Sequence, residues 1–206
     1  MTLDVADVMG LAPVIPVLVI DRLDDAVPIA RALVGGGLPA LEVTLRTPVA
    51  LDAIRLMAGV DGAVVGAGTV LDARSLDAAV AAGARFIVSP GLSEPVVRAA
   101  AGATVPLLPG VATASDIMRG LDLGLSHFKF FPARAAGGIP ALTALAGPFG
   151  HVRFCPTGGI TQADAPDWLA LEQVLCVGGS WMAPRGDADP ARIEAAARLA
   201  GGLRGG

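Results

Sequence analysis

The sequence predicts a (β/α)8 barrel with a short helix before its first strand, and three observations support this. Short apolar runs alternate eight times with Ala- and Leu-rich stretches of helical spacing. Continuous apolar strands separated by helices indicate a parallel sheet that is covered on its faces. The length of 206 residues is close to the lower limit of about 200 for this fold, so we expect one barrel domain over 1–206 with tight loops.

The eight expected strands are the runs richest in Val, Ile, Leu and Phe, and in chain order they span 14–20, 40–45, 63–69, 86–90, 106–111, 127–132, 153–158 and 174–179. An expected helix follows each strand, near 23–35, 48–58, 73–82, 94–101, 114–123, 139–146, 163–170 and 190–200. The opening helix lies near 2–10. Helical stretches end in Gly35-Gly36-Gly37, Gly83, Gly102 and Gly124, where we expect left-handed caps.

A doubly wound open sheet is the alternative arrangement of the same alternating elements. Its phosphate-binding fingerprint is G-x-G-x-x-G after the first strand. Here Ile20 is followed by Asp21, Arg22 and Leu23, so the fingerprint is absent. The barrel is therefore the preferred interpretation.

The composition excludes several classes of protein. With 53% hydrophobic and 17% charged residues, the chain is not intrinsically disordered. Pro, Gly, Asp and Arg interrupt every apolar run before the roughly 18 residues of a membrane helix. The net charge is −4 without the basic patch of a nucleic-acid-binding surface. The start lacks a basic signal-peptide opening, and Cys155 and Cys176 fit neither a zinc site nor a secreted disulfide scaffold, so we expect a cytoplasmic protein.

Lys129 is the single lysine of the chain, whereas arginine occurs 14 times. It lies in the sixth expected strand between Phe128 and Phe130, and side chains alternate between the two faces of a strand. If Lys129 faces the barrel interior, burial disfavours its charged form, and a neutral amine is a nucleophile for ketones and aldehydes. The alternative is a lysine that reaches the strand end or lies on the outer face.

Glu42, Thr44 and Arg46 share one face of the second expected strand, whose other face reads Leu-Val-Leu. The outer face of a barrel strand packs under helices and should be apolar, so the polar face is expected to point into the barrel interior or mouth. A structural Glu42–Arg46 ion pair is the alternative. Their Cα atoms would lie about 13 Å apart on a strand, which argues against direct pairing.

The loops after the last two strands indicate an anion-binding site. Glycines expose backbone N–H groups, and the loops after strands seven and eight of such barrels often hold phosphate. Each of these strands ends in a Gly-Gly turn beside a hydroxyl, which gives the candidates Thr157, Gly158, Gly159, Gly179 and Ser180. Thr69 ends the third strand in a Gly-rich segment that would let a ligand or a backbone come close. Tight turns that merely need glycine are the alternative for the two Gly-Gly loops, and packing alone is the alternative for the glycines before Thr69.

These candidates together indicate one chemistry. An amine nucleophile, an acid/base carboxylate, an arginine and a phosphate cradle suit carbon–carbon bond cleavage or formation through a Schiff base, because a protonated imine withdraws electrons from the neighbouring carbon. His127 and His151 have no partners at metal-ligand spacing, and we expect both to be structural or solvated. No metal ion is expected.

A resemblance to a known family rests on the segments Glu42-Val43-Thr44-Leu45-Arg46-Thr47, Val65-Gly66-Ala67-Gly68-Thr69-Val70, Ser89-Pro90-Gly91, Phe128-Lys129-Phe130-Phe131-Pro132-Ala133 and Arg153-Phe154-Cys155-Pro156-Thr157-Gly158-Gly159-Ile160. In these segments, and over about 13 to 184, the chain resembles the 2-keto-3-deoxy-6-phosphogluconate (KDPG) aldolases, a family that includes bifunctional enzymes acting also on 4-hydroxy-2-oxoglutarate (KHG). The resemblance implies a homotrimeric class I aldolase without a cofactor. The implied reaction yields pyruvate and glyceraldehyde 3-phosphate in the Entner–Doudoroff pathway.

The resemblance also implies a role for each candidate. Lys129 would form the Schiff base and Glu42 would shuttle protons, in part through water. Arg46 would hold the substrate carboxylate, with Thr69, Pro90 and Phe131 around the pyruvyl group. The phosphate end would be held by Thr157, Gly158, Gly159, Gly179 and Ser180.

Arg134 departs from the family pattern, because an acidic residue commonly follows the Phe-Phe-Pro-Ala segment. Its positive charge near the barrel mouth could aid anion binding or alter the stereochemical preference. Other functions stay open. A galactonate-specific aldolase would use the same residues, an isomerase would use Glu42 as base without a covalent step, and a sugar-phosphate-binding module would need neither Glu42 nor Lys129.

Overall fold

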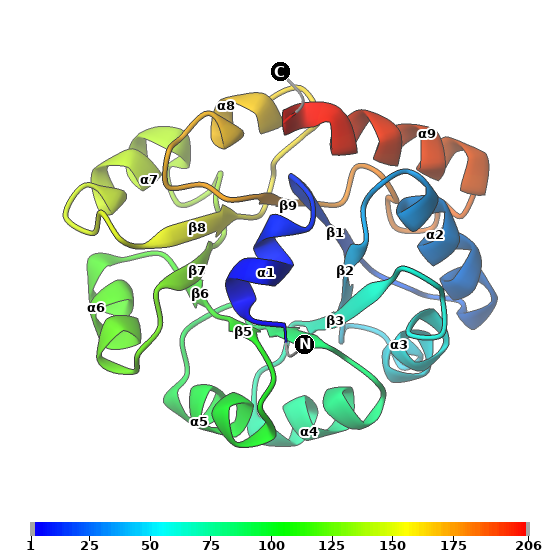
Figure 1. The fold of residues 1–206 in the computed structure, drawn as a ribbon, viewed down its shortest axis with the longest axis horizontal. Coiled ribbons are helices and arrows are strands. Elements are labelled where there is room, and N and C mark those ends of the chain that lie inside the picture. The colour runs from blue at the N-terminus through cyan, green and yellow to red at the C-terminus, as the bar shows by residue number, and fades with distance from the viewer. Residues whose placement is uncertain (1–2, 205–206) are drawn as a thin grey trace.

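The computed structural model describes residues 3–204 and forms a ring of parallel strands inside a layer of helices (Figure 1). The expected barrel is confirmed, whereas the ends of the expected 1–206 span lie outside the described residues. The strands are β1 (Val14–Leu18), β2 (Ala40–Thr44), β3 (Val64–Gly68), β4 (Phe86–Val88), β5 (Leu107–Leu108), β6 (Gly110–Val111), β7 (His127–Phe130), β8 (Arg153–Pro156) and β9 (Val177–Gly179).

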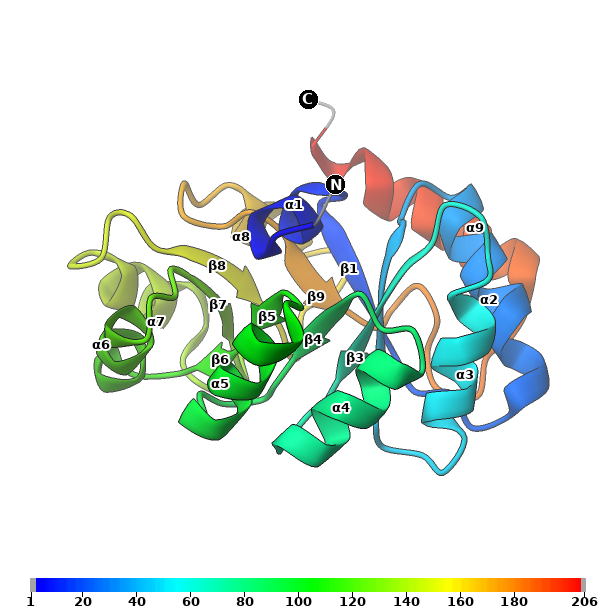
Figure 2. The same ribbon diagram turned by 60° about the horizontal axis from the view of Figure 1, so that its bottom comes forward.

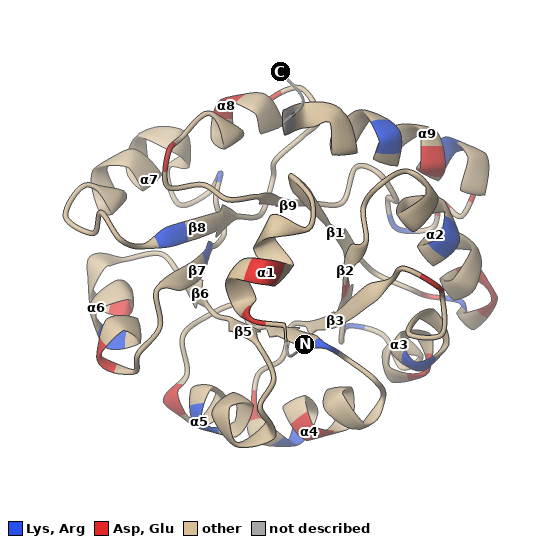
Figure 3. Ribbon diagram, viewed as in Figure 1, with Lys and Arg blue, Asp and Glu red and all other residues tan. Residues whose placement is uncertain are grey.

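The helices follow the strands in the expected order. They are α1 (Val5–Gly10), α2 (Leu23–Gly35), α3 (Ala50–Met57), α4 (Ala73–Ala81), α5 (Glu94–Ala103), α6 (Ala114–Asp122), α7 (Gly138–Ala146), α8 (Ala165–Leu169) and α9 (Pro190–Gly201), with a 3-10 turn at Gly202–Arg204. Within the described part of the chain, no helix is both long and apolar enough to cross a membrane. Acidic and basic residues are interspersed over the outer helices (Figure 3).

The strands pair in a closed circuit. Six of them run in the order β5-β4-β3-β2-β1-β9 and three in the order β6-β7-β8. The expected strand 106–111 is split into β5 and β6 by Pro109, because proline has no N–H to give to a strand ladder. The carbonyl of Pro109 still accepts the amide of Lys129 at 2.9 Å, and parallel bridges such as Thr157–Gly178 join β8 to β9.

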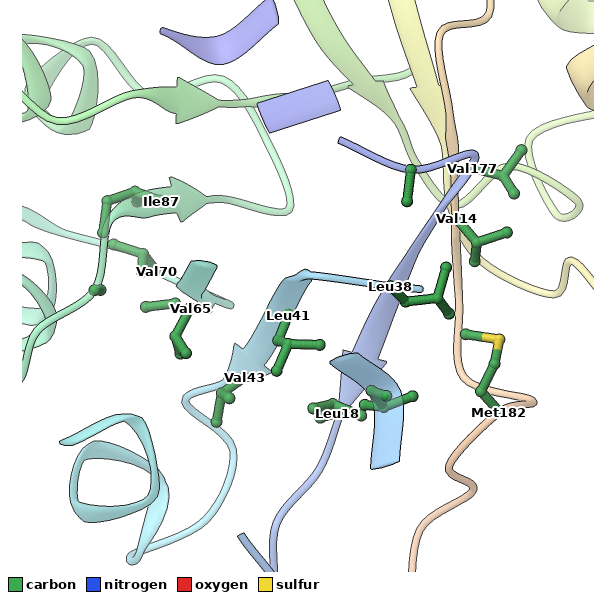
Figure 4. Close-up of a cluster of buried hydrophobic side chains, with 14 of the residues drawn as sticks. Val14, Leu18, Leu38, Leu41, Val43, Val65, Val70, Ile87, Val177 and Met182 are labelled. Atoms are coloured by element: carbon green, nitrogen blue, oxygen red, sulfur yellow. The ribbon is translucent and has the colours of Figure 1, made fainter. Parts of the chain in front are cut away.

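Two apolar clusters fill the molecule, one on each face of the strands. The larger cluster lies between strands and helices, and Figure 4 shows Leu18, Leu41 and Val43 in it. The smaller cluster lies inside the barrel and contains Ile15 and Phe86. Alternation of side chains along each strand therefore separates two cores.

Helix α1 closes one end of the barrel (Figures 1 and 2). Asp4 and Asp7 form a reciprocal capping box, in which the Asp4 carboxylate accepts the Asp7 amide at 2.7 Å. Val8 and Met9 then pack into the interior cluster. Residue 2, within the expected opening helix, lies outside the described residues.

The glycine caps were predicted correctly at three of four helix ends. Gly37, Gly83 and Gly124 have φ values of 91°, 101° and 80°, which glycine adopts without steric cost. Gly102 was predicted wrongly, because α5 continues through it to Ala103. That helix is capped by Thr104, whose φ of 53° is left-handed.

Candidate active site

A cavity of about 660 Å³ opens among the loops that follow the carboxyl ends of the strands. This is the end of the barrel opposite α1, as Figure 2 shows. Ten of the eleven expected site residues line it: Arg46, Thr69, Pro90, Lys129, Phe131, Thr157, Gly158, Gly159, Gly179 and Ser180. The expected strands ran past the observed ends of β4, β7 and β8, and the excess residues form these loops.

Lys129 projects from β7 into the barrel, as the alternation of side chains along the strand predicts. Its neighbours Phe128 and Phe130 belong to the outer apolar cluster. The Lys129 residue is only 6% exposed, and its Nζ lies 5.2 Å from the centre of the Phe131 ring. The amine therefore stands at the inner end of the cavity, shielded from bulk water.

Glu42 is the eleventh expected residue, and it lies behind the lysine rather than on the cavity wall. Its Oε1 and Oε2 accept hydrogen bonds from Lys129 Nζ at 3.1 and 3.5 Å, and the residue is 4% exposed. An ion pair this deeply buried contributes little net stability, but removing one partner leaves an uncompensated charge. Each of the two groups is therefore needed to compensate the buried charge of the other.

The three polar residues Glu42, Thr44 and Arg46, in β2 and the loop after it, have three different environments. Glu42 pairs with Lys129 and not with Arg46, so the alternative Glu42–Arg46 pair is not formed. Thr44 is fully buried and donates to the Leu18 carbonyl at 2.8 Å, which gives it a structural role. Arg46 reaches the cavity wall at the exposed strand end.

The glycines of β3 make room for side chains. A Cβ at Gly68 would lie 2.2 Å from Glu42 Oε1, and one at Gly66 would lie 2.4 Å from the Phe86 ring. The expectation that they admit a ligand or backbone is thus wrong. Gly68 instead leaves the space that the buried carboxylate occupies.

Thr69 has a φ of 61°, a left-handed conformation that costs a β-branched residue roughly 1–3 kcal/mol. Such strain persists only where the surroundings enforce it. Here it turns the chain at the end of β3 and places Thr69 on the cavity wall.

The loop after β8 has a backbone that requires glycine. Gly158 and Gly159 have φ values of 108° and 79°. The loop is fastened to the segment after β7, because the amides of Ala133 and Arg134 donate to the carbonyls of Thr157 and Gly158 at 2.8 and 3.1 Å. The Gly-Gly turn is thereby a fixed part of the wall.

Arg134 lies beside this loop but does not line the cavity. It pairs with Asp164, whose carboxylate also accepts the amide and hydroxyl of Thr161 at 2.6 and 2.8 Å. Burial raises the pKa of Asp164, but the hydrogen bonds from Thr161 and Arg134 outweigh it, so the pKa lies below its usual value. The Arg134 charge is therefore turned toward a carboxylate outside the cavity.

The sequence reasoning missed three polar residues of the wall, which are Thr161, Trp181 and Arg185. Trp181 packs on Gly179, where a Cβ would lie 1.8 Å from the indole ring. All three lie beyond the Gly-Gly turns, in the loops that the search for strand ends did not reach. A search of the whole loops after β8 and β9 would have found them.

His127 lies away from the cavity, at the opposite end of β7. Its Nδ1 is 3.1 Å from Ser126 Oγ, and burial lowers its pKa. Among residues 3–204, no cluster of three or more His, Cys, Asp or Glu could hold a metal ion.

A shielded amine paired with a carboxylate, at the inner end of a barrel cavity, is the arrangement of a class I aldolase. Comparison with known proteins makes the assignment specific. The family model for KDPG and KHG aldolases matches residues 5–196, and the chain belongs to this family.

Individual relatives align with most or nearly all of this chain at high sequence identity. The 2-dehydro-3-deoxy-phosphogluconate aldolase of Zymomonas mobilis is 58% identical over 201 residues, which cover 98% of this chain and 97% of that protein. The KHG/KDPG aldolase of Escherichia coli K12 is 56% identical over 178 residues, 86% of this chain and 84% of that protein.

Solved structures superimpose closely. The KDPG aldolase of Zymomonas mobilis ZM4 with 3-phosphoglycerate has a TM-score of 0.96 at 57% identity, covering 99% of this chain and 98% of that one. The Legionella pneumophila KDPG aldolase, with pyruvate captured as a covalent carbinolamine, has a TM-score of 0.90 at 46% identity, covering 96% and 97%.

Proposed function

We propose that this protein cleaves 2-keto-3-deoxy-6-phosphogluconate to pyruvate and glyceraldehyde 3-phosphate through a Schiff base on Lys129. The observation that carries the proposal is the buried Lys129–Glu42 pair at the inner end of a cavity whose outer wall is rich in glycine. The relatives named above support the same substrate.

The first step begins when the ammonium group of Lys129 passes one proton to Glu42, whose Oε1 lies 3.1 Å from Nζ. The neutral amine then attacks the C2 keto carbon of the substrate, and a proton moves from the attacking nitrogen to the oxygen to give the neutral carbinolamine. Glu42 gives its proton to the carbinolamine hydroxyl, which leaves as water, and the imine that remains is protonated and cationic. Phe131 beside Nζ keeps bulk water away from this carbon.

The second step breaks the C3–C4 bond of the substrate. The C4 hydroxyl loses its proton to Glu42 through a water, C4 becomes the aldehyde carbon of glyceraldehyde 3-phosphate, and the bonding electrons move into the imine. The resulting enamine takes a proton at C3 from Glu42. Hydrolysis then releases pyruvate and regenerates the Lys129 amine.

The remaining residues hold the two ends of the substrate. Arg46 pairs with the C1 carboxylate, because a guanidinium presents a planar fork that matches it. Thr69 and Pro90 contact the pyruvyl group. The phosphate is bound at the outer wall by backbone N–H groups of Gly158, Gly159 and Gly179 and by the Ser180 hydroxyl. Thr157 lines the wall beside them, but its amide donates to the Phe130 carbonyl and its hydroxyl to the Cys155 carbonyl.

A substrate panel tests the proposal. We expect pyruvate release from KDPG with a higher kcat/KM than from its galactonate epimer or from KHG. Preference for the epimer would support the galactonate alternative. The structure of native KDPGal also superimposes on this chain, with a TM-score of 0.83 at 28% identity. The isomerase alternative requires that no covalent adduct forms at Lys129.

We also propose that the whole chain is one domain and assembles as a cytoplasmic homotrimer. The relatives aligned over 97% and 84% of their lengths support the single domain. Light scattering should give three chain masses in solution, and a monomer would contradict the trimer.

A further inference from the structure

Arg185 is a cation on the cavity wall to which the proposed function gives no role. It lies in the loop between β9 and α9, on the same cavity as Gly159 and Ser180. Its side chain is 66% exposed, so it stands at the mouth rather than at the buried lysine. A residue here meets the part of a substrate that is farthest from Lys129.

Asp21 holds Arg185 in one orientation. Arg185 Nε donates to Asp21 Oδ2 and Nη2 donates to Oδ1, both at 2.8 Å, which is the two-pronged geometry of a strong arginine–carboxylate pair. Asp21 follows β1, so the contact joins the loops after the first and last strands. The hydrogen bond from Arg185 lowers the pKa of Asp21, because it stabilises the ionised carboxylate.

The pairing leaves one edge of the guanidinium available. A guanidinium has five N–H donors, and Asp21 takes one from Nε and one from Nη2. The two N–H groups of Nη1 and the second of Nη2 have no partner among the described residues. These three N–H groups can donate to an oxyanion of a ligand while Asp21 stays bound to the other edge of the guanidinium.

The charges of the wall favour an anion at this point. Among the described residues that line the cavity, the charged ones are Arg46, Lys129 and Arg185, and all are basic. Glu42 balances Lys129, and Arg46 is assigned to the substrate carboxylate. Glycine N–H groups supply dipoles but no charged donor for a phosphate dianion. Asp21 offsets part of the Arg185 charge, but the three guanidinium N–H groups that Asp21 does not bind are charged donors.

We propose that Arg185, oriented by Asp21, is a specificity-determining residue that binds the distal phosphate of the substrate and favours phosphorylated over unphosphorylated keto acids. The inference rests on the proposed function, which assigns the outer wall to phosphate. It adds a charged group to a subsite built from backbone and hydroxyls.

The test compares KDPG with unphosphorylated KHG in steady-state kinetics. In Arg185→Ala, we expect KM for KDPG to rise by roughly tenfold, because a charge-assisted hydrogen bond is lost, and kcat/KM for KHG to stay within about twofold. Competitive inhibition by inorganic phosphate should weaken in parallel. Added salt should reduce the difference in KM for KDPG between the unmodified protein and Arg185→Ala, since the Debye length falls with ionic strength.

Two further variants separate phosphate binding from loop anchoring. Asp21→Ala breaks the same contact between loops but leaves the cation, so its KM for KDPG should rise less than in Arg185→Ala. Arg22→Ala is the control, because Arg22 is a neighbouring exposed arginine that pairs with Asp24 and Asp25 and does not line the cavity. This variant should leave KM for KDPG and kcat/KM for KHG unchanged.

Equal KDPG effects in Asp21→Ala and Arg185→Ala would reduce Arg185 to a loop anchor and overturn the inference. So would an unchanged KDPG/KHG ratio in Arg185→Ala. Both outcomes differ from failure of the proposed function, in which the unmodified protein itself would not cleave KDPG.

Discussion

The two ends of the cavity are built in opposite ways. At the lysine end, Lys129 and Glu42 project from the hydrogen-bonded strands β7 and β2 and are almost fully buried. At the mouth, Gly159, Ser180 and Arg185 belong to loops and are exposed. Under the proposed mechanism, the groups that share a proton lie on the rigid barrel, whereas the groups proposed to select a substrate lie on loops that can vary without disturbing it.

The largest effect is expected from Lys129→Met, which breaks the lysine end. Without the nucleophile, kcat/KM for every keto-acid substrate should fall by on the order of 10⁴-fold or more. The variant also leaves Glu42 buried without a partner, which should cost about 3–5 kcal/mol of unfolding free energy in urea titrations. The double variant Lys129→Met/Glu42→Gln should recover much of that stability. Failure to recover it would show that packing, not the buried charge, sets the cost.

Glu42→Gln removes the base that the proposed mechanism uses in imine formation and in proton transfer at the neighbouring carbon. The amide keeps the shape of the side chain but is not a base, so exchange of pyruvate methyl protons with deuterium should slow by about 10²–10⁴-fold. Proton NMR in deuterium oxide measures this directly. Exchange at the normal rate would assign the proton transfer to another group.

Gly159→Val perturbs the mouth and should change the choice of substrate. A branched residue is strained at a φ of 79°, and its Cβ would lie 3.0 Å from that of Arg134. We expect kcat/KM to fall at least about tenfold more for KDPG than for KHG, because phosphate contacts are lost. Gly150→Val is the matched control, since Gly150 has open space around it. Equal losses on both substrates would make the turn structural.

The smallest effect is expected at His127, which belongs to neither end of the cavity. Burial lowers its pKa, so the unfolded chain binds the proton more readily than the folded one. Unfolding free energy should therefore fall as the pH drops below about 6.5, and His127→Gln should lessen that fall. Catalysis at neutral pH should be unchanged. A pH dependence identical in both proteins would contradict the assignment.

The same contrast decides what could be predicted from the sequence. The inward direction of Lys129 and Glu42 follows from the two-residue period of a strand, but their contact does not, because 87 residues separate them. The left-handed turn at Thr69 and the break at Pro109 depend on tertiary surroundings. Arg185 lies in an irregular loop, which has no regular alternation of side chains from which the direction of its own side chain could be predicted. The sequence therefore predicts strand-borne residues better than loop-borne ones.

The central claim, a Schiff base on Lys129, is tested most directly by trapping with pyruvate and borohydride. Lys129 is the single lysine, so only the amino terminus can compete. We predict one reduced pyruvyl adduct per chain, on the peptide that contains Phe128-Lys129-Phe130, and none in Lys129→Arg, whose guanidinium stays protonated. A folded, active protein that gives no adduct, or one confined to the amino terminus, would contradict the mechanism.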